Sequence, residues 1–136
     1  MKPTTRLWTA QAVLSALFLF AGVSKLITPT DLLAAQSHMP GDFIKFIGIC
    51  ETLGAFGLIL PGLTKIRTGL TPLAAAGLVI IMIGAVVTSI IQGAGLGSAF
   101  PGVVGLLAFY VARGRWPKTV PQSEVILEPT VLRRAA

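Results

Sequence analysis

Residues 70–91 read LTPLAAAGLVIIMIGAVVTSII, a run without one charged side chain. A transmembrane helix needs about 20 consecutive apolar residues, so this run is long enough to cross a bilayer. One such run alone would also suit the core of a soluble protein. However, 54% of the 136 residues are hydrophobic and 12% are charged, about half the charged fraction of a soluble domain. The chain therefore lacks the polar residues for a soluble shell.

Three further apolar runs complete the pattern, and the four predicted spans are 7–27, 43–60, 70–91 and 98–113. Because lipid offers the backbone no hydrogen bonds, a spanning segment must be a helix or part of a closed barrel. The runs lack the alternation of barrel strands. We therefore predict an all-α fold, an antiparallel four-helix integral membrane bundle in residues 1–116. Residues 117–136 are predicted to form a cytoplasmic tail.

Basic residues mark one side of the predicted bundle. They precede the first span, separate the second from the third and follow the fourth: Lys2, Arg6, Lys65, Arg67, Arg113, Arg115 and Lys118. The positive-inside rule predicts that both termini are cytoplasmic. The expected location is a bacterial-type cytoplasmic (inner) membrane, crossed several times. On the outer side, residues 31–37 predict a short surface helix between the first two spans.

The charged and metal-binding residues exclude several classes of function. The net charge of +6 comes from short clusters between apolar runs, which suits lipid headgroups rather than nucleic acid. The single cysteine, Cys50, rules out a CxxC pair, and the single histidine, His38, rules out a bis-His haem within one chain. The acidic residues and His38 do not have the spacing of a metal site. No metal or cofactor is predicted to be built into the chain.

Glu51 is the residue that most requires an explanation. It lies eight residues beyond Phe43, about 12 Å into the second span at the helical rise. A carboxylate at that depth is costly unless it is paired or solvated. Lys25, near the outer end of the neighbouring first span, is the expected partner. The pair either fixes the register of two helices or lines an outward-facing pocket where Glu51 exchanges a proton or binds a polar head.

Other polar residues would complete such a pocket. His38 would close over it from the outer loop, and Thr52, Thr88 and Ser89 would contact the ligand. Each has a structural alternative: a solvated histidine, or hydroxyls that bond backbone carbonyls. Cys50 points about 100° away from Glu51 on a helix and is interpreted as a packing residue. A cavity open at Glu51 would favour ligand binding, whereas a pair sealed by side chains would favour a structural role.

Two segments, residues 20–26 (FAGVSKL) and 47–61 (IGICETLGAFGLILP), resemble the DoxX-like family. The resemblance extends over about residues 7–115 and implies a four-helix membrane protein in which Lys25 and Glu51 match the family's charged positions. The family name comes from a subunit of a thiosulfate:quinone oxidoreductase. The resemblance therefore implies membrane redox chemistry coupled to quinone, although some relatives look like assembly helpers. Many members carry a histidine near the end of the third helix, where this chain reads VVTSI at residues 86–90.

Two functions remain open at this point. In the first, the chain is a small subunit or enzyme of a quinone-linked membrane redox system. Glu51 and Lys25 are its catalytic residues, quinone is its cofactor, and a membrane redox partner or a homo-oligomer completes it. In the second, the chain is a non-enzymatic membrane protein that binds a hydrophobic small molecule or assists the assembly of a partner membrane protein. The pair of Lys25 and Glu51 is then structural.

Overall fold

The computed structural model describes residues 3–67 and 69–117. These residues form five α-helices and one 3₁₀-helix, with no strand among them. The elements are α1 (Pro3–Ile27), α2 (Thr30–Ser37), α3 (Gly41–Thr64), α4 (Leu70–Ile91), η1 (Gly95–Ser98) and α5 (Ala99–Arg115). Four segments are long and apolar enough to cross a membrane. The predicted all-α four-helix bundle is therefore confirmed, whereas the predicted tail lies outside the described residues from residue 118 onward.

Local sequence explains where the helices end. The residue before a proline disfavours helical backbone. Helix α1 ends at Ile27, two residues before Pro29, and α2 ends at Ser37, three residues before Pro40. His38 caps α2 with a left-handed backbone (φ 55°), and its N–H donates to the carbonyl of Ala34 at 3.0 Å. After α4, Gly93 adopts φ 71°, a conformation that glycine tolerates without steric cost.

The second span differs from its prediction, because α3 continues past Pro61 to Thr64. A proline removes one backbone donor, and neighbouring helices in a membrane often supply a replacement nearby. Here Gln11 of α1 donates its amide N–H to the carbonyl of Leu58 at 2.5 Å. The carbonyl that Pro61 leaves without its helical donor is that of Gly57, so the bond from Gln11 to Leu58 joins α1 to α3 near the proline without replacing the missing donor.

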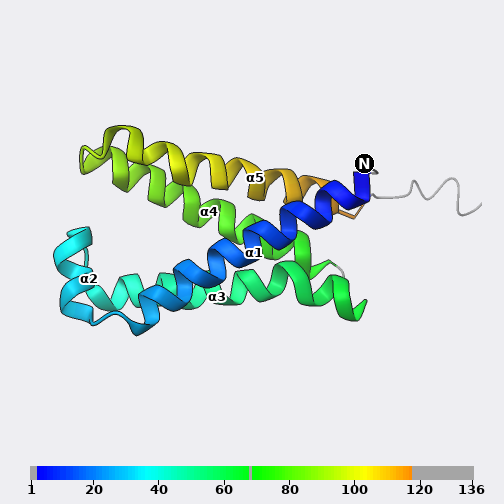
Figure 1. The fold of residues 1–136 in the computed structure, drawn as a ribbon, viewed down its shortest axis with the longest axis horizontal. Coiled ribbons are helices and arrows are strands. Elements are labelled where there is room, and N and C mark those ends of the chain that lie inside the picture. The colour runs from blue at the N-terminus through cyan, green and yellow to red at the C-terminus, as the bar shows by residue number, and fades with distance from the viewer. Residues whose placement is uncertain (1–2, 68, 118–136) are drawn as a thin grey trace, which may run out of the picture.

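The long helices form two pairs. Figure 1 shows α1 beside α3 and α4 beside α5, with the pairs crossing near one end and diverging toward the other. We call the end that holds the N-terminus, the α3–α4 connection and the end of α5 the inner end, following the predicted orientation. The outer end holds α2 and η1. The four long helices alternate in direction, as an antiparallel bundle requires.

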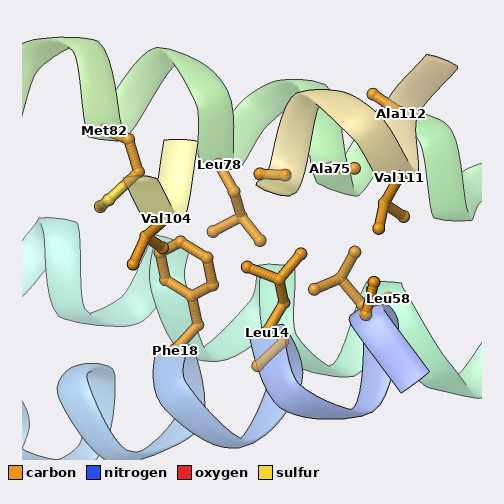
Figure 2. Close-up of a cluster of buried hydrophobic side chains, with 12 residues drawn as sticks. Leu14, Phe18, Leu58, Ala75, Leu78, Met82, Val104, Val111 and Ala112 are labelled. Atoms are coloured by element: carbon orange, nitrogen blue, oxygen red, sulfur yellow. The ribbon is translucent and has the colours of Figure 1, made fainter. Parts of the chain in front are cut away.

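The apolar core fills the inner half, where the pairs meet (Figure 2). Leu14, Leu58 and Val111 are completely buried there. Phe18, Met82 and Val104 form the outer limit of this core, because they also line a cavity that lies beyond it. Many large apolar side chains are instead exposed, such as Ile91 at 79%. A soluble monomer rarely shows such a continuous apolar surface, so the surrounding solvent is lipid.

Small residues bring α1 and α3 into backbone contact. A Cβ atom added to Gly22 would lie 2.7 Å from the carbonyl oxygen of Gly48, and one added to Gly48 would lie 3.0 Å from that of Gly22. No hydrophobic force joins helices in lipid, so close packing of this kind carries much of their association.

We predict that Gly48→Leu destabilises the protein by about 1–3 kcal/mol, because the larger side chain forces α1 away from α3. Denaturant-induced unfolding in detergent, followed by circular dichroism, measures the change. Gly77→Leu is the matched control, since nothing lies within 4 Å of a Cβ atom at Gly77. An equal loss of stability in both variants would contradict the proposed packing role of Gly48.

Candidate functional site

An ion pair joins α1 to α3 in the outer half of the bundle. The Nζ atom of Lys25 lies 2.6 Å from the Oε2 atom of Glu51, so the pairing expected from the sequence is present. The Glu51 side chain is 3% exposed and that of Lys25 is 29% exposed. The ammonium group is therefore the more accessible member of the pair.

The backbone contact between the two helices positions this pair. Gly48 has no side chain, so the stem of Lys25 crosses α3 at that point, and its Cβ atom lies 3.0 Å from where a Cβ of Gly48 would stand. Glu51 follows Gly48 by three residues, which places it on the same side of α3 and one turn deeper. Lys25 can therefore reach the carboxylate with an extended side chain.

The pair lies on the wall of a cavity of about 1100 Å³ between the two helix pairs. All five α-helices contribute to the wall, which is mainly apolar. Its polar members are Ser24, Lys25, Thr28, Gln36, Ser37, Glu51, Thr88 and Gln92. The cavity exists because the pairs diverge beyond Phe18, Met82 and Val104, where the packed core ends.

Part of the cavity wall is exposed on the surface of the bundle. Three of its aromatic wall residues, Phe20, Phe46 and Phe100, are more than half exposed. They belong to segments that are long and apolar enough to cross a membrane. The cavity wall is therefore continuous with the apolar surface of the bundle.

Helix α2 lies across the outer end of the cavity. Its Leu33 is buried against the bundle, and Leu33, Gln36 and Ser37 all line the cavity. Gln92, at the end of α4, donates its amide N–H to the carbonyl of Ser37 at 2.7 Å. This hydrogen bond joins α2 to the second helix pair, so that α2 covers the outer end of the cavity.

The four predicted ligand residues lie in different places. Thr88 lines the cavity, and its hydroxyl donates to the carbonyl oxygens of Gly84 and Ala85 at 2.9 and 3.1 Å. Thr52 lies at the α1–α3 contact and donates to the carbonyl of Gly48 at 2.8 Å. Neither Ser89 nor the exposed His38 belongs to the cavity wall. Successive helical residues point about 100° apart, which separates Ser89 from Thr88.

The wall also includes residues that the sequence analysis did not assign to a pocket. Cys50, interpreted as a packing residue, lines the cavity beside Glu51. The cavity is wide enough to contact two neighbouring rows of side chains on α3. Ser24 lies in the last turn of α1 and Thr28 follows the end of that helix, and Thr28 donates its hydroxyl to the carbonyl of Ser24 at 2.7 Å. Their spacing of four residues places them on one side of a helix, next to Lys25, and this pattern could have indicated from the sequence that they line the same pocket.

Comparison with known proteins identifies one family. The sequence profile of the DoxX-like family matches residues 9–111, a range that contains both members of the ion pair and most of all four spans. No match was found among curated proteins or among solved structures. Because the profile covers well over half of the chain, this protein belongs to the DoxX-like family.

Proposed function

We propose that this DoxX-like protein binds a lipid-like molecule in the outer cavity, with the polar head of the ligand at Lys25 and Glu51. The observation that carries this proposal is the position of the ion pair on a wall of the 1100 Å³ cavity. Ligand sites typically enclose about 300–1,000 Å³ and combine apolar walls with a few polar groups. The pair is the one ion pair among the described residues.

The form of the cavity supports a membrane-soluble ligand. Its exposed aromatic wall residues lie toward the lipid, whereas α2 covers the outer end. An apolar body would pack against Phe18 and Met82, and the charged pair offers a donor and an acceptor to a polar head. An entirely apolar ligand would leave the remaining hydrogen-bonding capacity of this pair unused, which is unfavourable in a low-dielectric site.

Within this class, a quinone fits the family best. Reduction of a quinone to a quinol takes two electrons and two protons. In this proposal the Lys25 ammonium donates a hydrogen bond to a quinone carbonyl, and Glu51 exchanges protons with the outer side. A membrane redox partner supplies or accepts the electrons. The chain then acts as a small subunit of a quinone-linked system in a bacterial-type inner membrane, with both termini in the cytoplasm.

A second candidate function rests on the burial of Glu51. At 3% exposure, its carboxylate also joins α1 to α3 and fixes their register. The protein is then a non-enzymatic bundle that holds a hydrophobic molecule or assists assembly of a partner membrane protein. In this case removal of both charges leaves the cavity able to bind.

Substitution of the pair separates these functions. The purified protein is expected to retain a hydrophobic ligand, detected by mass spectrometry. Removing one charge leaves the other buried and unpaired, a cost of about 3–5 kcal/mol. The double variant Lys25→Met/Glu51→Gln avoids that cost, so we predict that it folds and retains about tenfold less ligand than wild type.

Lys45→Met is the matched control for this experiment. Lys45 also lies in the outer half, but it does not line the cavity, and its Nζ atom contacts the carbonyl of Leu26 at 3.4 Å. This variant should retain the ligand. Normal ligand content in the folded double variant would remove the pair from the binding site and favour its structural role.

The thiol of Cys50 provides a direct test of occupancy, because it is the only cysteine in the sequence and lines the cavity. We predict that decylubiquinone slows the labelling of Cys50 by N-ethylmaleimide several-fold, since both occupy the same space. Labelling is followed by intact-protein mass spectrometry. A fatty alcohol of similar length is the comparison ligand, and equal protection by it would favour the non-enzymatic candidate over a quinone site.

The control for this experiment moves the thiol out of the cavity. In Cys50→Ala/Leu73→Cys, the thiol replaces a residue of α4 that is 62% exposed and absent from the cavity wall. Its labelling should not change with decylubiquinone. If the quinone slows both thiols equally, or neither, the cavity is not its binding site.

A further inference from the structure

The inner end of the bundle carries positive charge that no described acidic residue balances. Its basic residues are Arg6, Lys65, Arg67, Arg113 and Arg115, whereas the acidic residues among the described positions, Asp31, Asp42 and Glu51, all lie in the outer half. Four of these five basic side chains are exposed to the surroundings. Arg115 is the exception and lies partly buried at the end of α5.

Arg115 is held in place by two contacts. Its Nε–H group donates to the Oε1 atom of Gln11 at 2.7 Å, and Gln11 is itself anchored to the carbonyl of Leu58. The guanidinium carbon lies 5.1 Å from the centre of the Trp8 ring, within the range of a cation–π contact. The guanidinium is therefore oriented before any ligand arrives.

One nitrogen of this fixed group has no partner. The Nη2 atom of Arg115 is buried and makes no hydrogen bond among the described residues. A buried donor on a charged group is costly to leave without an acceptor. A bound anion would supply the missing acceptor, because the described residues place no carboxylate at the inner end.

Arg115 also lines a second cavity of the bundle. This cavity encloses about 310 Å³ and is lined by Arg115, Gln11, Thr71 and glycines that include Gly69. Because a water molecule occupies about 30 Å³ in the liquid, the cavity can hold a tetrahedral anion with a few waters. Thr71 adds a hydroxyl, and α4 begins at Leu70, so the positive end of that helix dipole faces the same region.

We infer that this inner cavity binds the phosphate of an anionic phospholipid headgroup, with the guanidinium group of Arg115 as the principal ligand. Trp8 and Trp116 flank Arg115 near the ends of the spans, the level at which aromatic residues meet headgroups. Planar guanidinium groups suit phosphate oxygens. This site is separate from the outer cavity and does not depend on the function proposed for it.

Lipid titration followed by native mass spectrometry tests the site on the full chain in detergent. We expect phosphatidylglycerol to bind wild type more tightly than zwitterionic phosphatidylcholine. Arg115→Gln should weaken phosphatidylglycerol binding about tenfold, because it removes a charge-assisted hydrogen bond. Arg113→Gln is the control, since it removes the same charge from an exposed position of the same helix. Equal losses in these two variants would overturn the site in favour of general charge attraction.

Further variants keep the test decisive if Arg115→Gln folds poorly. Thr71→Val preserves shape and should weaken lipid binding severalfold, and unchanged binding would count against the cavity.

Millimolar inorganic phosphate tests whether the anion comes from solution rather than from a lipid headgroup. If it binds wild type and displaces the lipid through Arg115, the anion comes from solution and the lipid assignment is wrong.

Discussion

The backbone contact of α1 with α3 at Gly22 and Gly48 is the constraint on which the outer site depends. Only glycine at both positions lets the helices approach so closely. That approach allows the stem of Lys25 to cross α3 and reach Glu51, one turn deeper. The same feature therefore serves packing and electrostatics. Small residues supply the helix association that a hydrophobic force cannot supply in lipid, and they place a charge pair where it would otherwise be costly.

The two halves of the bundle divide the remaining tasks. In the inner half, Leu14, Leu58 and Val111 close the core, and Gln11 links α1 to both α3 and α5 by hydrogen bonds. In the outer half the helix pairs diverge, and α2 covers the space that they leave. The packed inner core joins the two helix pairs, so the pairs can diverge in the outer half, where α1 and α3 keep their own contacts.

Features that depend on one helix, or on the contact of two helices, could be predicted from the sequence. Apolar run lengths predicted the four-helix bundle, and Asp31–Ser37 lies within the observed α2. The cost of an isolated carboxylate pointed to the contact of Glu51 with Lys25. The cavity could not be predicted, because it depends on the crossing of two helix pairs. For that reason Cys50 was interpreted as a packing residue, and His38, Thr52 and Ser89 were expected at a wall that does not include them.

The exposed wall residues Phe20, Phe46 and Phe100 have a consequence for the affinity of the lipid-like ligand proposed above. A ligand that enters from lipid competes at its mole fraction in the membrane, where a hydrophobic molecule is greatly enriched over water. The transfer of its tail from water has already been made by the bilayer, so tail burial in the cavity adds little selectivity. Discrimination among membrane molecules then falls on the headgroup, and thus on the few polar atoms that Lys25, Glu51 and Thr88 present.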